Sequence, residues 1–284
     1  MLTAAPWLTN NSLPPDGLTY GDSAGPVTTI YVAEGYENES NGQSGQIEKF
    51  NTSGTSLGTM TTYDGTHSFG QPNGVAYFGG NIYVVDQVNN AVYEINPAGP
   101  TLIHSLTTWT STGGSAPGSF AGPEGIAVDG SGNVYVADTG NDYIEVFTSA
   151  LSTTPLAEFG GSGSANSKFN NPSALTVDVS GNIYVADASN QRIQIFTSSY
   201  VYSSQFSTGS SSDIYGITLD STPHIYVADS GTAQVEEYNS AGVFLTSGLG
   251  ISPAHSPSPD GLIFIGSNLL VADYSNNQLY LVAP

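Results

Sequence analysis

Residues 172–196 read PSALTVDVSGNIYVADASNQRIQIF, and this stretch decides the fold. Short runs of alternating side-chain character are separated by turn residues, a pattern that predicts three successive antiparallel strands. In the middle strand, 183–187, Tyr184 and Ala186 face one way while the flanking Ile, Val and Asp face the other. Because both faces carry bulk, we expect both to pack against neighbouring sheets.

The central phrase of this stretch occurs six times along the chain. Its copies end in an acidic residue at Glu34, Asp86, Asp138, Asp187, Asp229 and Asp273. Successive copies are 52, 52, 49, 42 and 44 residues apart, a period typical of propeller blades, which repeat roughly every 40–50 residues. The repeat fills most of the 284 residues. It therefore predicts a single all-β domain, a six-bladed β-propeller of four-stranded antiparallel blades.

The ends of the chain are expected to close this ring. The sixth repeat stops after its third strand, and the segment 4–10 precedes the first repeat, so it is free to supply the missing outer strand, with Trp7 as its anchor. Closure of this kind removes an exposed sheet edge. The expected limits are a closing strand at 4–10 and blades at about 14–61, 72–108, 123–161, 172–208, 213–250 and 259–284.

The repeats resemble the NHL family of six-bladed β-propellers, and residues 172–196 are close to the phrase typical of that family. The resemblance covers nearly the whole chain. It implies a binding module, a lyase or a structural domain, because one fold hosts many functions. The Asn-His-Arg turn usual in the family is mostly replaced, for example by Asn190-Gln191-Arg192. Partner recognition through a basic face is therefore not expected.

The charge composition excludes several classes of partner. Lys49, Lys168 and Arg192 are the only strong cations, against 24 Asp and Glu residues, and the formal net charge is −21. We expect no nucleic acid as a partner, because its affinity comes mainly from Lys and Arg at phosphates. Anionic membrane surfaces are disfavoured for the same reason, and no apolar run is long enough to insert into a bilayer.

The composition also favours a location outside the cell or at its surface. Charged residues make up 10% of the chain, against about 25% in ordinary domains, and such a neutral polar surface is typical of exported proteins. The sequence contains no cysteine, so no redox argument applies. The first residues lack the pattern of a signal peptide. We therefore expect a mature or excised chain, with a cytoplasmic protein as the alternative.

The positions where the repeats differ are the candidates for function. Each blade enters its innermost strand through a loop whose side chains should surround the channel mouth, at Asp16, Asn73, Glu124, Ser173, Tyr215 and Asp260. Asp16, Asn73, Glu124 and Asp260 come from adjacent blades and form an oxygen-rich set suited to Ca²⁺. The set is similar to the metal site of calcium-dependent lactonase-type propellers. Alternatively, Pro-Asp-Gly and Pro-Asn-Gly are simply favoured turn sequences.

The recurring acidic residue and the histidines favour structural roles. Six acidic residues in one register predict bonds to turn amides rather than one differentiated catalytic site. Of the four histidines, His67 and His255 fall in entry loops, whereas His104 and His224 fall in an outer strand and an opposite turn. A zinc site is therefore not expected.

These observations predict an exported, non-catalytic binding or structural module. It would mediate protein association, with a partner or with itself, at a cell surface or in an extracellular assembly. One alternative is a Ca²⁺-dependent hydrolase or lyase of the lactonase type, in which Tyr215 or His67 handles protons. A second alternative is a carbohydrate-binding propeller, which would require aromatic side chains exposed on one rim.

Overall fold

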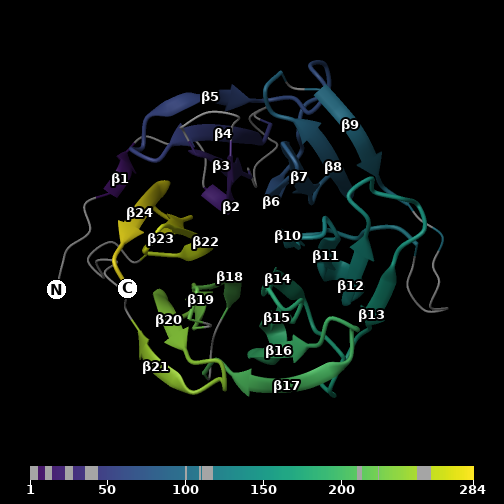
Figure 1. Cartoon of the computed structure of the whole chain (residues 1–284), viewed down its shortest axis with the longest axis vertical. Helices are drawn as coiled ribbons and strands as arrows, with labels where there is room; N and C mark the ends of the chain where they lie inside the picture. Colours follow the sequence, from purple (N-terminus) through teal and green to yellow (C-terminus); the bar gives the residue numbers. More distant parts are fainter. Residues whose placement is uncertain are drawn as a thin grey trace.

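The computed structural model describes residues 6–9, 15–22, 28–35, 44–99, 101–108, 110, 118–209, 213–222, 224–247 and 257–284. Figure 1 shows six sheets arranged in a ring around a centre, with the innermost strand of each sheet nearest to it. Every sheet has four antiparallel strands. The predicted six-bladed all-β propeller is therefore confirmed.

The first three blades follow the chain from the inner strand outward. Blade one comprises β2 (Pro15–Asp22), β3 (Thr28–Glu34), β4 (Gln46–Asn51) and β5 (Ser56–Met60). Blade two comprises β6 (Pro72–Phe78), β7 (Asn81–Asp86), β8 (Ala91–Asn96) and β9 (Thr101–Leu106). Blade three comprises β10 (Ile126–Val128), β11 (Val134–Asp138), β12 (Tyr143–Phe147) and β13 (Ala157–Gly160), with the short 3₁₀ turn η2 (Thr139–Asn141) after β11.

Blades four and five repeat this order. Blade four comprises β14 (Pro172–Val177), β15 (Ile183–Asp187), β16 (Arg192–Phe196) and β17 (Tyr202–Ser207), with the 3₁₀ turn η3 (Ala188–Asn190). Blade five comprises β18 (Ile214–Leu219), β19 (Ile225–Asp229), β20 (Gln234–Tyr238) and β21 (Phe244–Ser247).

Among the described residues, no helix is long and apolar enough to span a bilayer.

Blade six joins the two ends of the chain. It comprises β22 (Pro259–Ile265), β23 (Asn268–Asp273), β24 (Gln278–Val282) and, as its outer strand, β1 (Pro6–Thr9). β1 pairs antiparallel with β24, with Thr9 opposite Gln278. The predicted closure by the N-terminal segment is confirmed, whereas the expected anchoring by the Trp7 side chain lies outside the described residues.

The hydrophobic core lies between the blades. Each of its six clusters is shared by two neighbouring blades. In β15, Tyr184 and Ala186 pack towards blade five, while Ile183 and Val185 pack towards blade three. This two-sided burial is the arrangement that the alternating pattern of 183–187 predicts.

Candidate functional site at the central channel

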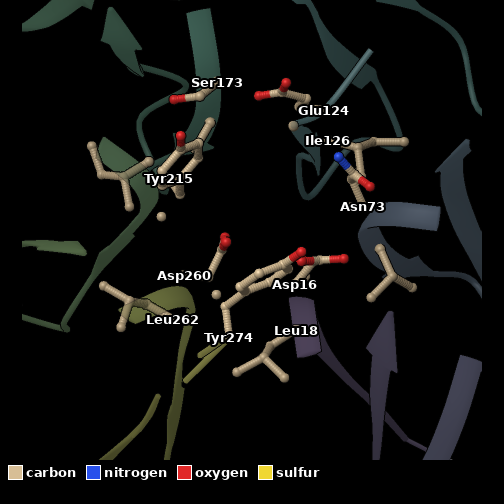
Figure 2. Close-up of a pocket in the computed structure, with 18 of the residues that line it drawn as sticks. Asp16, Leu18, Asn73, Glu124, Ile126, Ser173, Tyr215, Asp260, Leu262 and Tyr274 are labelled. Atoms are coloured by element: carbon tan, nitrogen blue, oxygen red, sulfur yellow. The ribbon is translucent and has the colours of Figure 1, made fainter. Parts of the chain in front are cut away.

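The six entry-loop residues line one cavity at the centre of the ring. Its volume is about 340 Å³, and Figure 2 shows Glu124 and Ser173 on one side of the opening and Asp16 and Asp260 on the opposite side. Asn73 and Tyr215 also belong to the lining. The structure thus brings together all six positions at which the repeats differ.

In five of the six blades a β-bulge places the entry residue at the start of the inner strand, whereas Glu124 of blade three lies just before β10. In blade two, Pro72 pairs with Asp86 and the register then shifts before Gly74, which leaves Asn73 as the extra residue. The same shift accompanies the entry residues of blades one, four, five and six. Because a bulge bends the strand and redirects a side chain, the entry residue lines the channel rather than joining the ladder.

The recurring Asp of the second strand holds the entry loop in place. The carboxylate of Asp86 accepts hydrogen bonds from the backbone N–H groups of Gly70 and Gln71, at 2.8 and 3.0 Å, in the loop that leads to Asn73. Equivalent bonds run from Ala121 to Asp138, from Asn170 to Asp187 and from Ser258 to Asp273. The predicted bonds to amides of the following turn are present for Asp86, Asp229 and Asp273, whereas Asp138 and Asp187 make no such cap bond. The bonds to the preceding loop were not predicted, and they position the loops that form the channel.

A glycine follows the entry residue in every blade but the fourth, where Ala174 follows Ser173, and it permits close approach between blades. A Cβ atom on Gly125 would lie 2.7 Å from the carbonyl oxygen of Ser173, and one on Gly74 would lie 2.6 Å from that of Glu124. These Pro-x-Gly segments lie at strand starts rather than in isolated turns. Glycine is therefore required there by its missing side chain rather than by an unusual backbone conformation.

Two carboxyl groups of the cavity have raised pKa values. Burial, together with the negative charge of Glu124, raises the pKa of Asp260 well above its ordinary value. Burial raises the pKa of Glu124 to about 7, although its Oε1 accepts a bond of 3.0 Å from Gln87 Nε2. Asp16 accepts the backbone N–H of Gly35 at 2.8 Å. At neutral pH the cavity is therefore acidic and partly protonated.

The expected calcium site has its residues in one cavity but not in a compact cluster. Within the described part of the chain, no three His, Cys, Asp or Glu side chains form a group that could hold a metal ion. Calcium binding by Asp16, Asn73, Glu124 and Asp260 stays a prediction, and its ligands would have to include groups other than carboxylates.

The two residues considered for proton transfer lie in different places. Tyr215 is 43% exposed at the cavity. His67 does not belong to the lining, and its Nδ1 lies 2.6 Å from Asp64 Oδ2 in an exposed pair. Of the two, Tyr215 is therefore the side chain that a molecule in the cavity would meet.

A second set of lining residues was not anticipated from the sequence. An apolar side chain follows each entry residue two positions later and also faces the cavity, at Leu18, Val75, Ile126, Leu175, Ile217 and Leu262. Tyr274 adds an aromatic ring from the turn after β23. The regular spacing of two residues could have identified the apolar set, because alternate residues of a strand share a face.

Comparison with known proteins agrees with this architecture. The family model for the NHL repeat matches residues 120–147 and 169–196, in blades three and four. Among curated proteins, no sequence matches this chain significantly.

Several solved structures share the fold at low sequence identity. Virginiamycin B lyase from Staphylococcus aureus is 14% identical, with 98% of this chain and 97% of that chain covered and a TM-score of 0.66. A chain of a nidogen–laminin complex is 18% identical, with 87% and 83% covered and a TM-score of 0.62. The WD40 repeats of RRP9 are 15% identical, with 97% and 81% covered and a TM-score of 0.63. These similarities show the fold alone.

Proposed function

Because the chain is a six-bladed β-propeller with NHL repeats, we propose that it is an exported, non-catalytic module that mediates protein association at a cell surface or in an extracellular assembly. The first partner to consider is a second copy of the chain. Export is inferred from the low charged fraction of 10% and is tested by fractionating source cells with an antibody against the protein.

One feature of the outer rim carries this proposal. Val243, Phe244 and Leu245 are consecutive, and their exposed fractions are 57%, 51% and 45%. Phe244 packs edge-on against Tyr238, with ring centroids 5.7 Å apart, so an underlying aromatic residue supports it. Runs of consecutive exposed apolar side chains are unfavourable in water unless something covers them.

The backbone at this place also favours association. β21 is the outermost strand of blade five, and its paired neighbour on the inner side is β20. Native proteins usually protect such an edge with charged residues or proline. The outer strands β5, β9, β17 and β21 contain no Asp, Glu, Lys or Arg. A second extended strand could therefore approach without meeting a charge, despite the net charge of −21.

Other propellers give this proposal general support. A chain of this fold occurs in a nidogen–laminin complex, and the WD40 repeats of RRP9 share the architecture. At sequence identities of 18% and 15%, the partners of these proteins are not assigned to this chain. The nidogen–laminin structure is that of a complex, which is compatible with a role of this fold in assemblies.

Sedimentation velocity over a range of protein concentrations tests the proposal. We expect the wild-type chain to self-associate and the double variant Phe244→Ser/Leu245→Thr to remain monomeric with an unchanged circular dichroism spectrum. Val179→Ser is the matched control, because Val179 is a fully exposed apolar residue in the turn before β15. A wild-type chain that is monomeric at every concentration, or a double variant that associates like the wild type, would contradict association through this rim.

A further inference from the structure

The central chamber has two chemically different layers. One ring consists of the six entry residues, which supply oxygen atoms from carboxyl, amide and hydroxyl groups. The other ring consists of the six apolar residues two positions along each strand, from Leu18 to Leu262. Their exposed fractions lie between 4% and 9%, so these side chains are covered by protein except where they face the chamber. The chamber is therefore amphipathic.

The polar layer favours positive charge. Among the described residues that line the chamber, Asp16, Glu124 and Asp260 are the ones with carboxyl groups, and Lys, Arg and His are absent from that lining. Asn73 adds an acceptor that lacks a donor, because its buried Oδ1 atom has no hydrogen-bond partner. A half-turn of this amide about its soft terminal torsion would direct the carbonyl towards the chamber. A ligand rich in N–H donors would thus satisfy groups that the protein leaves unsatisfied.

The arrangement fits an organic cation better than a metal ion. No three carboxyl or imidazole groups of the described chain are close enough to hold one ion, and a metal would make no use of the apolar layer. The volume of about 340 Å³ lies in the range of small-molecule sites, which is roughly 300–1,000 Å³. Tyr215 and Tyr274 provide aromatic faces of the kind that attract alkylammonium groups.

We propose that the central chamber binds a small amphipathic amine, whose ammonium group lies between Glu124 and Asp260 and whose hydrocarbon part packs on the apolar ring. The ammonium group has three N–H donors for the carboxyl and amide oxygen atoms of the polar ring. The ring of Leu, Val and Ile side chains takes the hydrocarbon out of water. The site is separate from the exposed rim around Phe244, so binding does not depend on association there.

The affinity should increase with pH. The titratable groups that face the chamber are Asp16, Glu124, Asp260, Tyr215 and Tyr274. Burial raises the pKa of Glu124 to about 7 and raises that of Asp260 as well, so acid keeps both carboxyls neutral. An amine that stays charged from pH 5 to pH 8 therefore meets more negative charge at pH 8.

Isothermal titration calorimetry on the full chain tests this site with 2-phenylethylamine as the probe. We expect 2-phenylethylamine to bind about tenfold or more tightly than 2-phenylethanol, its neutral analogue, since one charge-assisted hydrogen bond is worth about that factor. Phenylacetate, the anionic analogue, should not bind. The affinity for the amine should fall by about tenfold or more between pH 8 and pH 5.

Two variants and a control locate the binding. Glu124→Gln and Asp260→Asn should each weaken amine binding by about tenfold, whereas Glu48→Gln should leave it unchanged. Glu48 lies in β4, where it bonds to Ser56 outside the lining, so it controls for the loss of one negative charge. Equal binding of amine and alcohol by the wild type, or amine binding that survives both chamber variants, would overturn the proposal. Calcium chloride that binds while the amine does not would replace it with a metal site.

Discussion

Replacing Glu145 with glutamine is expected to stabilise the protein at neutral pH. Glu145 lies in β12, its side chain has no exposure to solvent, and neither carboxyl oxygen has a hydrogen-bond partner. Burial, with smaller contributions from Glu158 and Asp138, raises its pKa from the ordinary 4.5 to about 9. The folded protein therefore holds this proton at neutral pH, whereas the unfolded chain releases it.

The sign and the size of the effect follow from this difference in proton binding. Between pH 4.5 and pH 9 the folded state binds one proton more than the unfolded state, so the free energy of unfolding decreases as the pH rises. The loss is about 1.4 kcal/mol for each pH unit. At pH 7 the free energy of unfolding is thus about 3 kcal/mol lower than in acid, because the folded state must keep this carboxyl protonated. An uncharged amide at this position does not carry that cost.

Blade four shows how glutamine would fit. Gln194 occupies the same place in β16: its Oε1 accepts the N–H of Ser167 at 3.0 Å, and its Nε2 donates to Lys168 O at 2.7 Å and Asp187 Oδ2 at 3.0 Å. In blade three the corresponding carboxylate is Asp138, which is fully buried at the end of β11. The substitution Glu145→Gln should therefore place a side-chain N–H donor near the carboxylate of Asp138, in addition to removing the buried carboxyl group.

Urea unfolding and thermal unfolding of wild type and Glu145→Gln at pH 5, 7 and 8 provide the assay. We expect little difference at pH 5 and an increase of about 3 kcal/mol at pH 7, equivalent to a rise in Tm of roughly 5–10 °C for a chain of this size. Glu48→Gln is the matched control, because Glu48 holds the same place in β4 but is partly exposed and accepts the Ser56 hydroxyl at 2.9 Å. A pH dependence identical in wild type and Glu145→Gln would refute the reasoning.

Two further predictions concern the ring itself. Deletion of residues 1–12 removes β1 from its pairing with β24 and should lower the Tm by about 10 °C or more, because the last blade loses its outer strand. Deletion of residues 1–5, which keeps β1, is the control. Equal Tm values for the two truncated chains would count against closure of the ring by β1. Gly125→Ala should lower the free energy of unfolding by about 1–3 kcal/mol, because the new Cβ would lie 2.7 Å from the Ser173 carbonyl oxygen. Gly130→Ala, where no atom lies within 4 Å of the new Cβ, should leave it nearly unchanged. Similar unfolding curves for the two variants would contradict the close contact between blades.

Much of the channel could be predicted because the repeat is regular. The positions of Asp16, Asn73, Glu124, Ser173, Tyr215 and Asp260 were identified by comparing equivalent places in the six copies, and all six line the cavity. Their shared location follows from symmetry, since equivalent residues of a closed ring surround one axis. The sequence did not indicate the bulge that redirects the side chain in five of the blades, because a bulge depends on how two strands pair.

The buried acids show the limit of reasoning from the sequence. Glu145 occurs in the strand YIEVF, where alternation alone does not distinguish it from Glu48 in QIEKF. In the structure one is fully buried without a partner and the other is partly exposed and hydrogen-bonded. Glu48 has the Ser56 hydroxyl of the adjoining outer strand as a partner, whereas no such donor reaches Glu145.

The sequence by itself determined the number of blades, their four-stranded form and the closing role of the N-terminal segment. These features depend on local alternation and on a period of 42 to 52 residues, and both can be read from the order of residues along the chain. Only the tertiary structure decided the layered chamber, the raised pKa values of Glu124 and Asp260 and the exposed rim at Phe244. Burial, desolvation and the approach of one blade to the next are set by contacts between distant residues, and these contacts exist only in the closed ring.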